Sequence, residues 1–150
     1  MRLKDVLVHL DRVLTEERVA RVALEQLQES LLTDASLGRL LPFDRIDIRE
    51  CRRNIEHTYV VRVFAVFEWI LREMWANVFH RRTNPRMVDL INGVAAARKF
   101  VNQQLVQNVH AVREYRNTLV HVGAPSAPPV TLAECGRYLK AFLSELPREW

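Results

Sequence analysis

Apolar residues recur at intervals of three and four along most of this chain, which is the spacing of helices that bury one side. The first such stretch covers residues 3–32 and predicts one long helix or two abutting helices. The apolar positions that form this pattern are Leu3, Val6, Leu7, Leu10, Val13, Leu14, Val19, Ala23, Leu27 and Leu31. Residues 33–47 contain Gly38, Pro42 and scattered aspartates, which indicates a connection with room for one helical turn.

The strongest helical pattern runs from about Ile48 to Phe79. Its central stretch is rich in valine and aromatic residues, so propensity alone would also allow a β-strand. The length of the stretch and its three-to-four spacing favour a helix instead. The apolar positions cover a wide arc of that helix, which predicts burial on more than one side. They are Ile55, Tyr59, Val60, Val63, Phe64, Phe67, Ile70, Leu71, Met74, Trp75 and Val78.

Two further helices are expected in the second half of the chain. Asn84 followed by Pro85 predicts a helix with Asn84 as its N-cap and Pro85 at its first position. This helix should run to about Lys99. The next helix should run from about Asn102 into the segment Arg113–Gly123, and its apolar residues keep the helical spacing.

The last helix is separated from these by a loop. Gly123 and three prolines exclude a helix between residues 122 and 130. Thr131 and Glu134 form the pattern of a capping box, and Pro147 ends the helix that this box opens. The residues expected on the inner side of this helix are Leu132, Cys135, Leu139, Phe142, Leu143 and Leu146.

These elements predict an all-α fold, an antiparallel bundle of four to five helices in a single domain that spans residues 1–150. The 150 residues suffice for one substantial core, and 49% of them are hydrophobic. No apolar run reaches membrane-spanning length, and the charged N-terminal stretch does not resemble a signal peptide. Cys51 and Cys135 stand far apart, which argues against a zinc site or a disulfide framework. We therefore expect a soluble, cytoplasmic protein that requires no metal or other cofactor.

The net charge of +4 is distributed unevenly. Residues 81–121 carry a net charge of +5, whereas residues 1–50 carry −2. A surface that binds phosphate groups needs such a concentration of positive charge, so phosphate contacts are predicted for this region. Its basic residues outside the motif described next are Arg81, Arg82, Arg86, Arg98, Lys99 and Arg113. An ordinary solvated face remains an alternative interpretation, since 19 of the 22 basic residues in the chain are arginine.

The segment Arg113–Gly123 holds the residues best suited to chemistry. Arg116, Asn117 and His121 place a permanent cation, an amide and an imidazole within two helical turns. On a straight helix Asn117 and His121 share a face, while Arg116 lies well around the cylinder from His121. If Arg116 and His121 cooperate, the helix must bend or end between them, or a second copy of the chain must supply one of the two.

Glu68 lies inside the apolar stretch of the helix at 48–79 and has two interpretations. The first is an ion pair with Arg72, four residues later and in the favoured order of acid before base. The second is a supporting role in a catalytic site, in which its carboxylate orients a group on a neighbouring helix. The ion pair is the simpler interpretation.

The pattern Arg-Asn-x-x-x-His at the end of a bundle helix resembles the signature of the HEPN superfamily. In that family an arginine is followed by a polar residue, often asparagine, and a histidine follows after a gap of four to six residues. Two other features agree, a Phe-x-x-Phe-Glu stretch in the earlier aromatic-rich helix and a Leu-Val pair just before the histidine. The resemblance covers residues 49–122 in sequence, and the first and last helices by architecture.

The resemblance implies a metal-independent endoribonuclease like those among toxins, abortive-infection proteins and antiviral-defence proteins. Arg116, Asn117 and His121 would be the catalytic residues, and a homodimer would bring two motifs together across a two-fold axis. RNA is then the substrate, and a cognate antitoxin or another regulatory protein could be a partner, with no role for a membrane. Some members continue His-x-Tyr and are modified by an antitoxin at that tyrosine, whereas this chain has Gly123 there.

A second function follows from the same resemblance, because many members of the superfamily are binding modules without catalytic activity. The chain would then serve dimerisation and the binding of RNA or a partner protein, and the motif would be a structural element. The intact residues of the motif favour the ribonuclease over the binding module.

Overall fold

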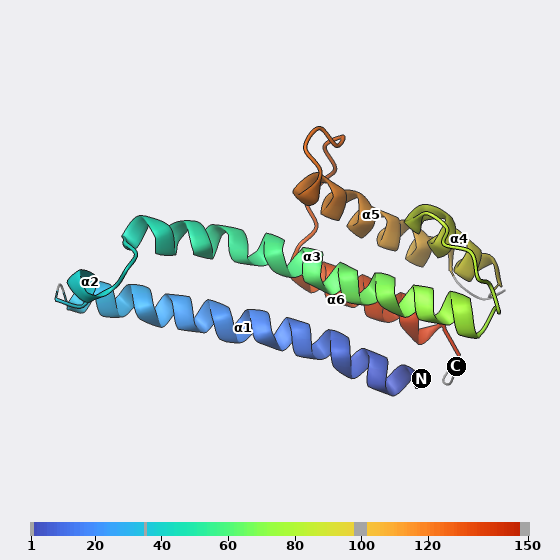
Figure 1. Ribbon diagram of the computed structural model, residues 1–150, viewed down its shortest axis with the longest axis horizontal. Coiled ribbons are helices and arrows are strands. Elements are labelled where there is room, and N and C mark those ends of the chain that lie inside the picture. Colours follow the sequence, from blue (N-terminus) through green and yellow to red (C-terminus); the bar gives the residue numbers. More distant parts are fainter. Residues whose placement is uncertain (1, 35, 98–101, 148–150) are drawn as a thin grey trace.

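The longest elements are two antiparallel helices, α1 (Leu3–Thr33) and α3 (Arg45–Asn77), which lie side by side (Figure 1). The computed structural model describes residues 2–34, 36–97 and 102–147. Helix α1 is unbroken, so the first apolar stretch forms one long helix and not two. The four-residue helix α2 (Leu37–Leu40) is the turn for which the connection between the long helices has room.

Helix α3 begins earlier than its apolar pattern predicts, because a pair of aspartates caps it. The Asp44 carboxylate accepts hydrogen bonds from the backbone N–H groups of Ile46 at 2.7 Å and Asp47 at 3.0 Å. The Asp47 carboxylate accepts in turn from the N–H of Asp44 at 2.9 Å. This capping box satisfies N–H groups that the first turn of any helix leaves without partners. The added first turn is solvent-exposed, which explains why the apolar pattern misses it.

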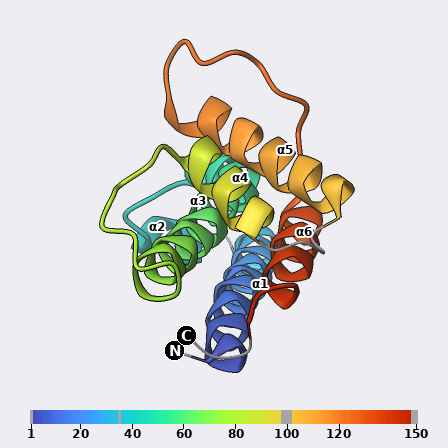
Figure 2. The ribbon, with the colours of Figure 1, turned by 90° about the vertical axis from the view of Figure 1, so that its right-hand side faces the viewer.

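Three shorter helices complete the fold: α4 (Met87–Ala97), α5 (Gln103–Val120) and α6 (Leu132–Ser144). Helix α6 packs against α1, α3 and α5, and α5 lies on the opposite side of the bundle from α1 (Figure 2). Helix α4 packs against α3 and α5. With α2 only one turn long, the described residues form an all-α bundle of five main helices, as predicted. Among the described residues, no helix is long and apolar enough to cross a membrane.

The start of α4 differs from the prediction that Asn84 caps it. The helix begins at Met87, and the amide oxygen of Asn84 accepts a hydrogen bond from the guanidinium of Arg72 on α3. Arg72 also donates to the backbone carbonyl of Pro85 at 3.3 Å. The Asn84 side chain is therefore bonded to α3 and does not cap α4. Asn84 and Pro85 both lie before the first residue of α4.

The starts of α5 and α6 lie where the sequence predicts them. The side chain of Asn102 accepts a hydrogen bond from the backbone N–H of Gln104 at 2.8 Å and so caps α5. Thr131 and Glu134 form the predicted capping box of α6. In that box the hydroxyl of Thr131 accepts from the Glu134 N–H at 3.3 Å, and the Glu134 carboxylate accepts from the Thr131 N–H at 3.0 Å.

Aromatic rings from α3 and α6 form the centre of the core. The fully buried ring of Phe67 lies 5.8 Å from the ring of Phe64 and 5.7 Å from the ring of Phe142 on α6. All six positions predicted to face inward from α6 are buried. A connected cluster of buried side chains includes residues from α1, α3, α4, α5 and α6, so these helices share one hydrophobic core.

The middle of α1 departs from its apolar pattern. Val19 is 64% exposed and Ala23 is also exposed, although both belong to the apolar positions of the sequence. A straight helix keeps a single face towards its neighbours, and in α1 that face is held by Val6, Leu10, Val13, Glu17 and Leu31. At Val19 the apolar positions of the sequence move to another side of the helix, whereas the straight helix keeps the same side towards its neighbours. Glu17 is therefore buried at a position where the core face would otherwise have an apolar residue. Its carboxylate accepts a hydrogen bond from Arg21 at 2.8 Å.

Helices α1 and α3 continue beyond α6 as a two-helix arm that ends at α2 (Figure 1). Leu132, the first residue of α6, contacts Glu56 of α3, so the part of α3 before Glu56 belongs to the arm. Polar contacts cross between the two helices there: Arg45 donates to the carbonyl of Leu31 at 2.5 Å, and Arg52 pairs with Glu25 at 3.9 Å.

We expect the substitution Phe67→Ala to lower the free energy of unfolding by about 3–5 kcal/mol, because it removes a fully buried ring between two others. Urea denaturation followed by circular dichroism measures the change. Phe43→Ala is the matched control, since that ring is 39% exposed, and it should cost about 1 kcal/mol or less. Equal losses for the two variants would show that the ring of Phe67 does not hold the core together.

Candidate active site at the end of helix α5

Helix α5 ends within the motif. Val120 is its last residue and His121 is its C-cap, with φ −117° and ψ 116°, so the backbone turns from helical to extended at the histidine. The N–H of His121 still donates to the carbonyl of Asn117 at 3.0 Å. The side chain of His121 is exposed to solvent. The helix thus ends between Arg116 and His121, which is one of the arrangements that the sequence left open.

A tight turn follows the histidine. The N–H of Ala124 donates to the carbonyl of His121 at 3.2 Å, and Gly123 has φ +81°. A positive φ at the third residue of such a turn is typical of type II, where glycine has no steric penalty. Val122 is fully exposed at the corner of the turn. A tyrosine at position 123, as in some HEPN proteins, would be strained in this backbone conformation.

Arg116 points towards α3. Its guanidinium carbon lies 5.9 Å from the centre of the Phe64 ring, and its Nη1 donates to the side-chain oxygen of Asn117 at 3.2 Å. Its Nε is buried and has no hydrogen-bond partner in the described part of the chain. No carboxylate of the described residues lies within ion-pair distance of Arg116. The site therefore holds a cation whose charge is not neutralised by a side chain of the described part.

The structure joins Arg116 and Asn117 but gives no contact between either side chain and that of His121. Arg116 faces the ring of Phe64, while His121 is exposed at the helix end. Any shared action on one substrate would therefore need the substrate to span the two groups, or a second copy to bring its own arginine or histidine.

Glu68 makes the ion pair that its spacing indicates. Its carboxylate accepts from Arg72 at 3.0 Å through Nε and at 2.6 Å through Nη2. Arg72 continues to Asn84 and Pro85, so Glu68 belongs to a link between α3 and the segment before α4. Among the described residues, no hydrogen bond joins Glu68 to the motif.

The basic residues of 81–121 are spread over the molecule. Arg81, Arg82 and Arg86 are exposed in the segment that leads into α4, which lies towards the start of α5 and away from His121 (Figure 1). Arg81 lies over the ring of Trp75 at 5.7 Å, and Arg86 pairs with Asp89 at 3.3 Å. Arg113 is mostly buried and pairs with Glu114 at 3.0 Å. Arg98 and Lys99 lie outside the described residues.

Three residues that the sequence did not assign to the site connect α3 with the end of α5 and the start of α6. The Glu56 carboxylate accepts from the N–H of Leu132 at 2.8 Å and so fixes the far end of the loop that follows His121. The ring of His57 meets the ring of Tyr115 edge-on, with 6.3 Å between their centres. Burial and the nearby carboxylate of Glu56 raise the pKa of Tyr115, so its phenol stays protonated at neutral pH. Contacts across 58 or more residues leave no local signal in a sequence.

A second histidine of α5 serves a structural contact. The Nε2 of His110 lies 2.8 Å from the side-chain oxygen of Asn92 on α4, and its Nδ1 is buried without a partner among the described residues. Burial, and then the positive charge of Arg113, lower the pKa of His110, so the ring is neutral at neutral pH. His110 thus links α5 to α4 as an uncharged group.

The buried thiol and the acidic groups of the described residues supply neither a nucleophile nor a metal site. Burial raises the pKa of Cys135 to about 12, with smaller contributions from Glu134 and Glu56, so this thiol is not a nucleophile at neutral pH. In the part of the chain that the structure describes, no three His, Cys, Asp or Glu side chains are grouped to hold a metal ion. The arrangement at the end of α5 therefore offers proton transfer by an exposed imidazole and charge stabilisation by a guanidinium.

Comparisons of the chain with protein-family models, with curated protein sequences and with solved structures gave no match in any of the three.

Removing the carboxylate that anchors the loop should loosen the start of α6. We expect Glu56→Ala to speed amide hydrogen exchange in residues 130–135 and to cost about 1–3 kcal/mol of unfolding free energy, because the Leu132 N–H loses a charged acceptor. Glu50→Ala, a half-exposed glutamate of the same helix, is the control and should leave this exchange unchanged. Unchanged exchange in both variants would mean that the loop is anchored by other contacts.

The two cysteines should differ in reactivity. At pH 8 we expect iodoacetamide to modify the exposed Cys51 within minutes to hours and to leave Cys135 unmodified, because burial keeps the Cys135 thiol protonated. Mass spectrometry of the digested protein reports each site. Modification of both sites in urea confirms that Cys135 is protected by the fold, and its rapid modification in the native protein would contradict the buried position.

Proposed function

We propose that the protein is a metal-independent endoribonuclease of HEPN type that cleaves RNA at the end of helix α5. The observation that carries this proposal is the state of Arg116, whose charge no carboxylate of the described residues neutralises, on the helix that an exposed histidine ends. A phosphodiester group of RNA would supply the missing negative charge. The resemblance of Arg116, Asn117 and His121 to the HEPN signature points to the same substrate.

RNA carries its own nucleophile, so the protein has only to move protons and stabilise charge. The 2′-oxygen attacks the adjacent phosphorus while the bond from phosphorus to the 5′-oxygen breaks, which leaves a 2′,3′-cyclic phosphate and a free 5′-hydroxyl. His121 can accept the proton of the 2′-hydroxyl or donate one to the departing 5′-oxygen. Arg116 can hold the phosphate oxygens through paired N–H groups and stabilise the extra negative charge of the pentacovalent state. Asn117 already contacts Arg116 and would orient it.

A homodimer with two motifs near its two-fold axis would supply both a general acid and a general base. Each chain has one histidine in the motif, and within one chain no hydrogen bond joins Arg116 to His121. A symmetric partner brings the second histidine and resolves this separation. Such an enzyme would act as a toxin or an antiviral-defence effector in the cytoplasm, held in check by an antitoxin or another regulatory protein.

One observation favours a different function, a HEPN-like module that binds RNA or a partner protein without catalysis. Arg116 is partly buried against Phe64 and bonded to Asn117, contacts that a purely structural arginine would also make. In that case the exposed His121 and Val122 would form part of a binding surface.

Substitution of the motif separates the two functions. We expect His121→Ala and Arg116→Ala each to lower the rate of RNA cleavage by on the order of a hundredfold or more, because proton transfer and charge stabilisation are each lost. A fluorescent RNA in gel and stopped-flow assays measures the rate. The matched controls are His9→Ala and Arg49→Ala, an exposed histidine and an exposed arginine of other helices, which should cleave at the unmodified rate.

The products and the effect of a chelator complete this test. Cleavage should continue in excess EDTA and leave a 2′,3′-cyclic phosphate, since the 2′-hydroxyl is the nucleophile. A motif variant that cleaves as fast as the unmodified protein would overturn the catalytic assignment. Absence of cleavage by the unmodified protein, with RNA still bound, would establish the binding module.

A further inference from the structure

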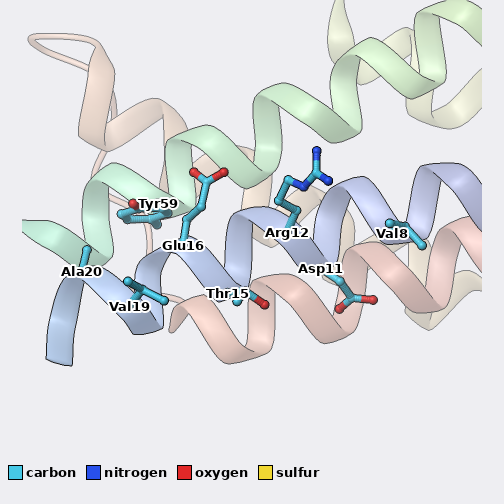
Figure 3. Close-up of a pocket in the computed structure, with 8 residues that line it drawn as sticks. All are labelled: Val8, Asp11, Arg12, Thr15, Glu16, Val19, Ala20 and Tyr59. Carbon is cyan, nitrogen blue, oxygen red and sulfur yellow. The ribbon is translucent and has the colours of Figure 1, made fainter. Parts of the chain in front are cut away.

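A shallow groove of about 610 Å³ runs along the outer side of α1, next to α3 (Figure 3). It does not contain the motif, and most of its surface is apolar. Val8 and Val19 lie at its two ends, Tyr59 of α3 forms its upper wall, and Arg12 and Glu16 point towards α3. Val8 is 54% exposed and Val19 is 64% exposed, so the described chain leaves more than half of each of these apolar residues uncovered.

The exposed residues of α1 follow the spacing of a helix–helix seam. Val8, Arg12, Thr15, Val19 and Val22 are separated by four, three, four and three residues, and all are exposed. This spacing keeps one stripe of a helix turned towards a single partner helix. The core-facing residues of the same helix form a separate stripe on its other side. Helix α1 therefore carries two faces, of which the bundle covers one.

We propose that a second copy of the chain packs its own α1 antiparallel against this seam, related to the first by a two-fold axis. In the register that we infer, Val8 lies opposite the partner's Val19, and Val19 lies opposite the partner's Val8. Arg12 then lies opposite the partner's Thr15, between the partner's Asp11 and the partner's Glu16. The axis passes halfway between the two valines of each copy.

Charge and shape on this face fit a second copy. A two-fold contact uses the same surface twice, so that surface has to carry both members of each pair. This seam carries both members of each pair. Val8 and Val19 are the apolar residues, and Arg12 lies between the carboxylates of Asp11 and Glu16. The carboxylates already have partners within the chain: Glu16 pairs with Arg62 at 2.6 Å, and Asp11 pairs with Lys140. Arg12 has no ion pair among the described residues, so the contact would give it two.

The seam and the motif are on different sides of the molecule. Helix α1 lies across the bundle from α5 (Figure 2). This inference therefore does not rest on the proposed ribonuclease activity. A chain with both this contact and the motif-centred dimer would form an assembly of four.

Acidic substitutions test the contact. We expect Val8→Glu/Val19→Glu to halve the mass that light scattering measures at tens of micromolar, because four added carboxylates meet across the two-fold axis. Leu32→Glu/Leu40→Glu is the matched control, since these residues are 65% and 80% exposed and lie outside the seam. A mass that is the same in the unmodified protein and in Val8→Glu/Val19→Glu would overturn the proposal. Retained RNA cleavage by the variant, or its absence in all proteins, reports on the motif and not on this contact.

Disulfide formation tests the register. In a Cys51→Ser background, the pair Val8→Cys/Val19→Cys should form a covalent dimer on mild oxidation, whereas each single substitution should stay monomeric on a non-reducing gel. Within one helix, residues 8 and 19 are about 16 Å apart, which is too far for a bond within the chain. Covalent dimers from either single variant would contradict the antiparallel register. Lack of any covalent dimer, including from the paired variant, would contradict the contact itself.

Discussion

The packing of α1, α4, α5 and α6 against α3 is the constraint on which the rest of the structure depends. Phe64, Phe67, Ile70, Leu71 and Met74 are all buried, and at 3.6 residues per turn they form one apolar arc of about 120° along α3. The helices packed against α3 contribute their own buried residues to the same core. The ring of Phe67 contacts α6 through Phe142, while the ring of Phe64 lies under the guanidinium of Arg116. The same helix therefore supports both the core and the motif.

The two ends of the motif differ in their surroundings: Arg116 packs against the core, whereas His121 is exposed. Arg116 is held by an aromatic ring beneath it and an amide beside it, so its position depends on the core. His121 is the residue at which helical hydrogen bonding stops, and only its backbone is bonded to the helix. The loop after it returns to the bundle where Glu56 accepts from the start of α6. The motif thus holds its cation against the core and leaves its imidazole in solvent.

The length difference between the helices has a second consequence. Helices α1 and α3 are about twice as long as α5 and α6, so a part of their surface has no partner within the bundle. A separate uncovered surface is the outer face of α1, which carries its exposed valines. Apolar side chains exposed at seam spacing favour association, whereas the mixed charges around them limit which partner fits. Assembly and catalysis would then depend on different faces of one small bundle.

The sequence by itself determined the all-α class, the order of the main helices, and the loop that stops α5. These features depend on residues a few positions apart: the three-to-four spacing of apolar side chains, the Thr131–Glu134 box, and the glycine and prolines after His121. The pairing of Glu68 with Arg72 is local in the same way. The tertiary structure alone decided where a contact between distant residues replaced the arrangement that the local sequence favours. Asn84 bonds to Arg72 instead of capping α4, Val19 is exposed because an unbroken helix keeps its phase, and Glu56 meets Leu132 across the bundle. Each of these outcomes depends on a neighbour that only the packing of distant helices brings into contact.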